Sequence, residues 1–357
     1  MDNIQALTYT AGIMSNKAFL RLAEKTQVVF PQNGRIETVQ NRLTHSFEVG
    51  NSARMAALSL DLPGIKVDYQ HALYNTCLLH DPGHPSFGHE GTSLLDRRFK
   101  ALGLEEGFCD NNNNFVVIEK NQIEVCDYTV ASIIKYPENL YPSQKDELIR
   151  KLDIAIAQDI RQFEKTLKIF ERPTRTIACE VMDEVDRNSY VTSDLADCFS
   201  LKLGNSNSLS ELLESNQFTD NKIIEFLIIA INAIDRHDKT LIKKVFNDLK
   251  VRLNLNYYLG DNIQLIAENT ELIELREFLF KIEKELFIDS ESVVKQRVEH
   301  MAYLNNYIDW VLEGNYPSST YKRLIENSSS EVERLRAIRD MIGETTDWYV
   351  INHNVNK

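Results

Sequence analysis

Apolar residues recur at spacings of three and four along most of this chain. The segment LIRKLDIAIAQDIRQFEKTLKIF, residues 148–170, shows this periodicity clearly. Glycine is sparse, with 13 residues among 357. Such a pattern is typical of amphipathic helices that pack their apolar faces together. We therefore predict an all-α fold, a helical bundle with additional helices in its C-terminal part.

Proline, glycine and asparagine divide this pattern into segments. We expect helices at residues 17–30, 38–60, 67–79, from about Thr92, at 143–169 and at 173–203. The stretch HDPGHPSFGHEG, residues 80–91, should be irregular because it contains two prolines and three glycines. The chain shows no internal repeat.

A domain boundary is best placed at GNSNSLS, residues 204–210, because this segment is polar and interrupts the helical pattern. We predict a core at residues 1–203 and a C-terminal helical region at residues 204–357, packed on that core. Interruptions are expected in this region near Gly260, at residues 314–319 and at residues 328–330.

The polar tract Asp110–Asn114 is expected to be a loop. Its run of asparagines is typical of a flexible linker, but its place between helical patterns also suits a loop that lines a site.

Composition and charge narrow the classes of function. A hydrophobic content of 43% allows a sizeable core, and a net charge of −13 argues against a protein that coats nucleic acid, so any phosphate site must be focal. The five cysteines show no CxxC spacing, which favours reduced thiols over disulfides or a zinc knuckle. No segment approaches the ~20 apolar residues of a membrane span, and MDNIQALTYT does not resemble a signal peptide. We expect a cytoplasmic protein without membrane contact.

Candidate chemistry centres on His80-Asp81, because a neighbouring imidazole and carboxylate at a helix end can bind one divalent cation. The pair is followed by His84 and His89 on a loop rich in glycine and proline, where catalytic groups concentrate. A second such pair, His237-Asp238, lies in the plain polar stretch RHDKT, which we interpret as a solvated turn.

Two helical segments offer further polar groups. In NRLTHSFEVG, Arg42 lies three residues before His45, so the two side chains share a face; a single histidine on such a helix is also typical of a packed or capping residue.

In EVDRNSYVTSDLADCF, one face carries Asp186, Tyr190 and Asp194 at i, i+4 and i+8, with Arg187 at its edge. Charges at this spacing are also typical of a solvated face.

Together these segments resemble a known family. NRLTHSFEVG, LLHDPGHPSFGHEG and VDRNSYVTSD, in this order, are similar to motifs of the HD-domain deoxynucleoside triphosphate triphosphohydrolases, the dGTPase-like proteins. KTQVVFP (25–31), IIKYP (133–137) and RDMIGETTDWY (339–349) are similar to further family motifs. The resemblance extends over roughly residues 17–352.

The resemblance implies an HD-domain fold and assigns roles to particular residues. The implied metal ligands are His45, His80, Asp81 and Asp186. Two imidazoles and two carboxylates suit Mn²⁺, Mg²⁺, Fe²⁺ or Co²⁺. The resemblance also implies that Arg42 and Arg187 bind phosphates, that Tyr190 packs against the nucleotide, and that Gln27 and Asp194 hold the 3′-hydroxyl. His84 and His89 are candidates for positioning the nucleophile or protonating the leaving oxygen.

The sequence departs from the family pattern at two places. Relatives usually carry an acidic residue at the position of Thr92, three residues after His89, and Glu90 is not oriented to replace it if a helix begins there. The run Asn111–Asn114 stands where many relatives have Asn-x-Gln; Asn111 can keep the first role, whereas Asn113 is shorter than glutamine.

The predicted function is therefore metal-dependent hydrolysis of a deoxynucleoside triphosphate, with dGTP among the candidate substrates, to the deoxynucleoside and tripolyphosphate. The alternatives are an HD nucleotidase or phosphodiesterase that acts on another nucleotide, and a nucleotide-sensing regulatory protein with an HD core. By resemblance, we expect a homo-oligomer, a hexamer or tetramer, with a dNTP or single-stranded DNA as candidate effector.

Overall fold

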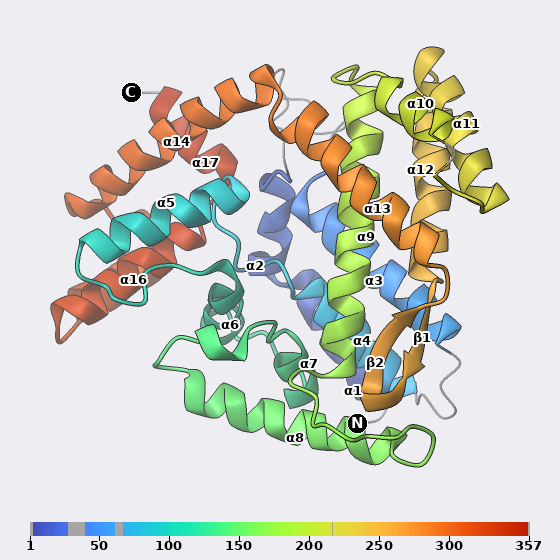
Figure 1. Cartoon of the computed structure of the whole chain (residues 1–357). Coiled ribbons are helices and arrows are strands. Elements are labelled where there is room, and N and C mark those ends of the chain that lie inside the picture. The colour runs from blue at the N-terminus through green and yellow to red at the C-terminus, as the bar shows by residue number, and fades with distance from the viewer. Residues whose placement is uncertain (1–2, 28–39, 61–66, 216, 356–357) are drawn as a thin grey trace.

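The computed structural model describes residues 3–27, 40–60, 67–215 and 217–355. Helices dominate these residues, which confirms the predicted all-α fold (Figure 1). A short antiparallel hairpin is also present, formed by β1 (Tyr257–Gly260) and β2 (Gln264–Ala267). It lies at the interruption that the sequence predicts near Gly260.

The helices before the predicted boundary vary widely in length. They are α1 (Asn3–Ser15), α2 (Lys17–Leu20), α3 (Arg42–Ser59), α4 (Val67–Leu78), α5 (Gly88–Ala101), α6 (Asp110–Lys120), α7 (Asp127–Ser132), α8 (Lys145–Phe163) and α9 (Ile177–Ser200). Short 3₁₀ turns occupy Arg21–Glu24 and Pro137–Asn139.

The helices after residue 203 cover both ends of the molecule. They are α10 (Asn207–Glu214), α11 (Asn221–Asp235), α12 (Lys239–Asn254), α13 (Thr270–Glu283), α14 (Glu291–Leu312), α15 (Ser319–Glu326), α16 (Glu331–Gly343) and α17 (Asp347–Val355). A 3₁₀ turn, Asp261–Ile263, connects the two strands, and a π-helical turn, Lys284–Ile288, follows α13.

The long helix α9 runs through the centre of the molecule and packs against α3, α4, α12 and α13 (Figure 1). Small residues allow this close packing: Ala53, Ala56 and Ala57 of α3 are buried in the shared core. At Gly50, a Cβ atom would lie 2.7 Å from the ring of Tyr74, so α4 approaches α3 where glycine leaves room. The helices α3, α4 and α9 therefore form a rigid support for any side chains that they carry.

The C-terminal helices form two further cores. The helices α10 to α13 enclose apolar side chains with the second half of α9, and α14 and α16 bury Tyr307, Ile308 and Ile338 against Leu95 and Phe99 of α5. The division at residues 203 and 204 stays a prediction.

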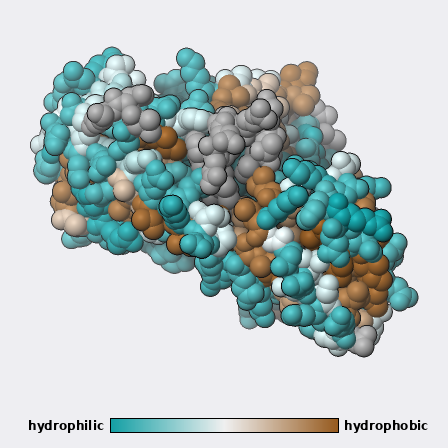
Figure 2. Space-filling view, turned by 90° about the horizontal axis from the view of Figure 1, so that it is seen from above, coloured by the Kyte–Doolittle hydropathy of each residue, from teal (hydrophilic) through white to brown (hydrophobic). Residues whose placement is uncertain are grey.

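The surface is largely polar where the apolar side chains are packed inside. The face seen in Figure 2 is mostly hydrophilic, with separate groups of hydrophobic residues between the polar ones. Among the described helices, none combines the length and the apolar character that a membrane crossing requires.

Two predicted segments differ from the structure. The helix expected at residues 17–30 ends at Glu24, because the next residues bridge to Asn41 instead, and residues 28–30 lie outside the described part of the chain. The expected loop Asp110–Asn114 is wrong: these residues form the first turn of α6, because their side chains bond to neighbouring loops while Phe115 to Ile118 are buried.

The other predicted helices are confirmed with shifted ends. α3 begins at Arg42, since Asn41 and Thr44 form reciprocal capping bonds, and residues 38–39 lie outside the described part. α5 begins at Gly88, four residues earlier than expected. α9 begins after Thr176, whose side chain caps the helix by accepting a bond from the Cys179 N–H.

Candidate active site

Four side chains from three parts of the chain converge beside the end of α4. The Nε2 atom of His45 lies 2.9 Å from Oδ1 of Asp186, and Nε2 of His80 lies 3.4 Å from the same oxygen. Asp81 Oδ1 lies 3.6 Å from His80 Nε2. The residues proposed from the sequence as metal ligands therefore lie together: His45 from α3, His80 and Asp81 after α4, and Asp186 from α9.

The geometry of this group suits a metal ion. Ligand bonds of about 2.1 Å at right angles place neighbouring ligand atoms roughly 3 Å apart. His80 donates a hydrogen bond from Nδ1 to the Cys77 carbonyl at 2.6 Å. In the neutral ring, the buried Nε2 atom then carries the lone pair that can bind a metal ion. That atom has no hydrogen-bond partner among the described residues. The donor set and the unpartnered nitrogen therefore fit a divalent cation.

Positive groups keep both carboxylates of this group ionised. Burial alone would raise the pKa of Asp81, but His80 and Arg42 hold that pKa well below its usual range. Burial would also raise the pKa of Asp186, and Lys135, whose Nζ lies 3.2 Å from Oδ2, lowers it instead. This lysine belongs to the segment IIKYP, whose sequence alone indicates no role for it.

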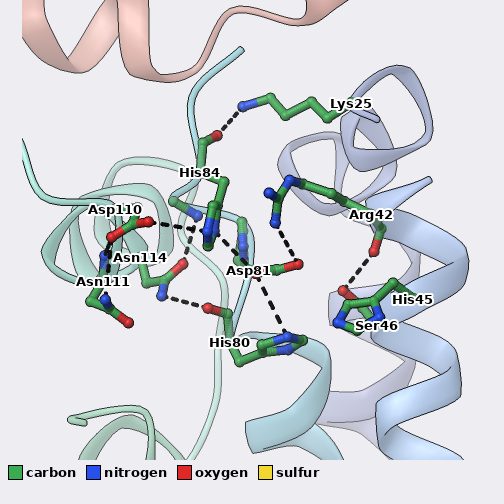
Figure 3. Close-up of polar contacts among 12 residues, drawn as sticks. Lys25, Arg42, His45, Ser46, His80, Asp81, His84, Asp110, Asn111 and Asn114 are labelled. Carbon is green, nitrogen blue, oxygen red and sulfur yellow. Dashed lines mark hydrogen bonds and ion pairs between the residues drawn. The ribbon is translucent and has the colours of Figure 1, made fainter. Parts of the chain in front are cut away.

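A second cluster lies on the other side of Asp81. Figure 3 shows His84 between Asp81 and Asp110, while Arg42 reaches toward Asp81 from α3. The distances are 3.0 Å from His84 Nδ1 to Asp81, 3.1 Å from His84 Nε2 to Asp110, and 2.9 Å from Arg42 to Asp81. His89 Nδ1 lies 3.6 Å from Asp110, and its side chain is 81% exposed.

Asn113 and Asn114 bind the loop between α4 and α5 that carries His80 and His84, here called the histidine loop. Asn114 accepts a bond from the Gly83 N–H at 2.6 Å and donates one to the His80 carbonyl at 2.7 Å. Asn113 donates to the Gly83 carbonyl at 2.8 Å. The asparagine tract is therefore not a flexible linker, because its side chains bind this loop. The alternative interpretation, that the tract lies at a site, agrees with the structure.

The C-terminal segment fastens the same loop. Asp347 is fully buried, and its two oxygens accept bonds from different segments: Oδ2 from the Thr26 N–H and hydroxyl at 2.9 Å, and Oδ1 from the Phe87 N–H at 2.8 Å. Lys25 donates to the His84 carbonyl. The segments similar to family motifs at both ends of the chain thus meet at the histidine loop.

A cavity of about 300 Å³ joins these groups. Every site residue proposed from the sequence, except Asp194, lines it, and so do Asp110, Asn111, Lys135 and Tyr136. A smaller cavity of about 150 Å³ shares Gln27, His89 and Tyr190 with the first and extends toward α14. The two cavities are therefore adjacent.

Three of the proposed substrate contacts have surroundings that the sequence did not reveal. Arg187 is about half exposed and pairs with Glu277 at 3.2 Å. Asp194 is buried behind Tyr190, and its Oδ2 has no hydrogen-bond partner among the residues described. Burial, Glu283 and Asp197 raise the pKa of Asp194 well above its usual range. Gln27 lines both cavities.

The His237-Asp238 pair forms no such site. Both residues are exposed in a turn, as predicted, and Asp238 caps α12 by accepting a bond from the Leu241 N–H. All five cysteines are free.

Comparison with known proteins agrees with the motifs. No protein-family model matches the sequence. The chain is 23% identical to a deoxyguanosinetriphosphate triphosphohydrolase-like protein of Shewanella halifaxensis, over 95% of this chain and 88% of that relative. A protein of the same description from Rickettsia prowazekii is 26% identical over the same shares.

A third relative is more similar over a shorter stretch. The deoxyguanosinetriphosphate triphosphohydrolase-like protein of Wolinella succinogenes is 32% identical over 190 residues, which cover 52% of this chain and 46% of that relative. Because several such proteins match most of the chain, it is similar over most of its length to the deoxyguanosinetriphosphate triphosphohydrolase-like proteins.

Proposed function

We propose that this chain is a metal-dependent deoxynucleoside triphosphate triphosphohydrolase, which converts a dNTP and water into the deoxynucleoside and tripolyphosphate. The observation that carries the proposal is the convergence of His45, His80, Asp81 and Asp186 beside Arg42 in one cavity. The names of the relatives make dGTP the first substrate to test.

The four converging side chains would hold one divalent ion, Mn²⁺, Mg²⁺, Fe²⁺ or Co²⁺. When bound there, such an ion polarises a phosphate oxygen and lowers the pKa of water. The role of the chain is to fix the ligands: the Cys77 carbonyl orients His80, and Lys135 neutralises part of the charge of Asp186.

Three cationic side chains would receive the phosphates. Arg42, Lys135 and Arg187 line the cavity, so positive charge is concentrated here although the chain as a whole carries a net charge of −13. Arg42 is buried and its Nε has no partner among the described residues, which supports a contact to the α-phosphate beside the metal ligands. Arg187 would leave Glu277 to bind the outer phosphates.

The sugar would lie toward Tyr190. The ring of Tyr190 borders both cavities and supports packing against the deoxyribose, while Gln27 and Asp194 would bond to the 3′-hydroxyl. Asp194 is buried and does not line the cavity, so this contact would require a rearrangement of the side chains between them.

His84 and His89 would carry out proton transfer. His84 lies between two carboxylates and is fixed, whereas His89 is exposed to the cavity and free to reach the leaving 5′-oxygen. Proton transfer by a positioned histidine contributes about 10²–10⁴-fold to a rate.

The product identifies the reaction. Purified protein is incubated with each of the four dNTPs and Mn²⁺ or Mg²⁺, and the products are separated by ion-exchange chromatography. We expect equal amounts of deoxynucleoside and tripolyphosphate, because in this proposal Arg42 and the ligand group would bind the α-phosphate at the metal. Orthophosphate with dNDP, or pyrophosphate with dNMP, would reject the triphosphohydrolase in favour of another nucleotide hydrolase.

Absence of turnover with all four dNTPs would favour a nucleotide-sensing role. Assembly into a hexamer or tetramer and activation by a dNTP or single-stranded DNA stay predictions.

A further inference from the structure

Three polar side chains lie around one carboxylate oxygen, Oδ2 of Asp110, beside the histidine loop. Oδ2 of Asp110 faces Nε2 of His84 at 3.1 Å, Nδ1 of His89 at 3.6 Å and the Thr92 hydroxyl at 3.5 Å. The Thr92 side chain thus ends beside the carboxylate of Asp110. An acidic residue is expected at position 92 by resemblance, and here it is a threonine.

The chain fixes Asp110 in this place. Its other oxygen, Oδ1, accepts a bond from the Asn111 N–H at 2.8 Å, so the carboxylate has a defined orientation at the first turn of α6. A Cβ atom at Gly83 would lie 2.3 Å from both the Asn114 nitrogen and the Asp110 carbonyl oxygen. The start of α6 therefore packs directly on the loop between His80 and His84, which only glycine allows.

The carboxylate is held in its charged form. Asp110 is 6% exposed. Burial alone would raise the pKa of Asp110, but His84 and His89 hold it well below its usual range. The N-terminal end of a helix also stabilises a negative charge. A buried, ionised carboxylate with two imidazole neighbours orients those rings.

We propose that Asp110 supplies the carboxylate that position 92 lacks and positions His84 and His89 for proton transfer. Asp110 lines the cavity and contacts His84 and His89, and in this proposal it acts through these two rings, so it is a positioning residue. This inference rests on the proposed phosphohydrolase function.

The proton balance of the step is simple. A bond forms between the water oxygen and the α-phosphorus, and the bond between that phosphorus and the 5′-oxygen breaks. The 5′-oxygen takes a proton from the imidazolium of His89, and the proton lost by the attacking water restores the imidazolium through solvent. Asp110 stabilises the charged imidazolium through Nδ1, which leaves Nε2 directed at the cavity.

The test compares Asp110→Asn with the parent protein and with Asp110→Asn/Thr92→Glu. We expect Asp110→Asn to lower kcat about 10²-fold, with KM for the dNTP within threefold of the parent and with unchanged metal content. In the double variant, a carboxylate reaches the same place from α5, so kcat should recover at least tenfold. Thr92→Glu alone should not raise kcat, because Asp110 already occupies that place.

Asp340→Asn is the matched control. Asp340 is also buried, and it pairs with Lys120 at the far end of α6, at 2.7 Å, so its loss tests whether any buried aspartate near this helix matters. We expect a lower melting temperature and an unchanged kcat. If Asp110→Asn does not fold, Asp110→Glu takes its place; it keeps the charge but displaces it by one methylene, and a tenfold lower kcat is expected.

Several results would overturn the proposal. They are a kcat of Asp110→Asn within threefold of the parent, a loss of metal in this variant, and no recovery in the double variant. If the parent hydrolyses a different phosphate ester, the proposed function fails but the same variants are compared on that ester. If the parent protein hydrolyses no phosphate ester, both the proposed function and the proposed role of Asp110 are wrong.

Discussion

Asp186 and Asp194 lie two turns apart on the same helix, α9; Asp194 is buried and Asp186 is partly buried, and their surroundings shift their pKa values in opposite directions. Asp186 contacts His45 and Lys135, and these positive or hydrogen-bonding partners lower its pKa well below the usual range although burial opposes this. Asp194 faces Glu283 and Asp197, and burial together with these carboxyl groups raises its pKa well above the usual range.

The difference shows that burial alone does not decide the charge of a carboxyl group; its partners do. Around Asp186 the neighbouring groups favour the charged carboxylate, whereas around Asp194 burial and the neighbouring carboxyl groups raise the pKa and so favour the protonated form. Under the proposed function, one helix would thus present a metal ligand at one end and a group that binds the 3′-hydroxyl at the other.

The largest effect is expected from removing the proposed metal ligands at the Asp186 end of α9. His80→Ala, Asp81→Ala and Asp186→Ala should each remove bound metal and dNTP turnover together, because the remaining ligands no longer complete the site. Metal content by mass spectrometry and turnover by product release measure both. His237→Ala is the matched control, since it removes a histidine from the exposed pair in the turn before α12. A folded ligand variant with near-parental turnover would contradict the assignment.

A smaller effect, on selectivity, is expected at the Asp194 end. The parent should use dideoxynucleoside triphosphates about 10²-fold less well than dNTPs in kcat/KM, because without the 3′-hydroxyl a buried polar group stays unpaired. Asp194→Ala should lower dNTP turnover and reduce this ratio at least tenfold, because no polar group is left unpaired.

Ser193→Ala serves as the control for selectivity. Ser193 precedes Asp194 on α9, donates a hydrogen bond to Glu48 at 3.0 Å and lines a different cavity, so the ratio should not change. If Asp194→Ala lowered both rates in the same proportion, the residue would have a structural role only.

The sequence was most informative at the metal end. The HD pair, the histidine of NRLTHSFEVG and the aspartate of VDRNSYVTSD each lie on or beside a helix that the sequence predicts, and within a helix the spacing of residues shows which of them share a face. The structure brings them together as the motifs indicate, and the all-α fold follows from the same periodicity.

Contacts between segments far apart in the chain could not be read from the sequence. The tract that begins at Asp110 is predicted as a loop because asparagine is a poor helix former. In the structure, Asn113 and Asn114 donate hydrogen bonds to the carbonyls of the histidine loop, and these contacts stabilise the first turn of α6. Lys135 and Glu283 acquire their importance only from Asp186 and Asp194, which lie 51 and 89 positions away along the chain. No local pattern encodes such pairs.

The smallest expected effect concerns stability and pH at the Asp194 end. Burial raises the pKa of Glu283 from 4.5 to about 7, although hydrogen bonds with Tyr190 and Asp194 lower it. Below pH 4.5 the carboxyl group is protonated in both the folded and the unfolded chain. Above this pH the unfolded chain loses the proton first, so the free energy of unfolding should fall as pH rises and level off above about pH 7.

Glu283→Gln isolates this contribution, because glutamine does not titrate. Between pH 4.5 and pH 8, the free energy of unfolding of the parent should fall by on the order of 3 kcal/mol relative to that of the variant. Urea unfolding at several pH values measures this difference. Asp159 contributes with the same sign, since burial raises its pKa to about 7, but it is present in both proteins and cancels in the difference. If the two stability curves ran parallel, Glu283 would be ionised in the folded chain. The raised pKa of Glu283, and with it the argument that burial favours protonated carboxyl groups at the Asp194 end, would then be wrong.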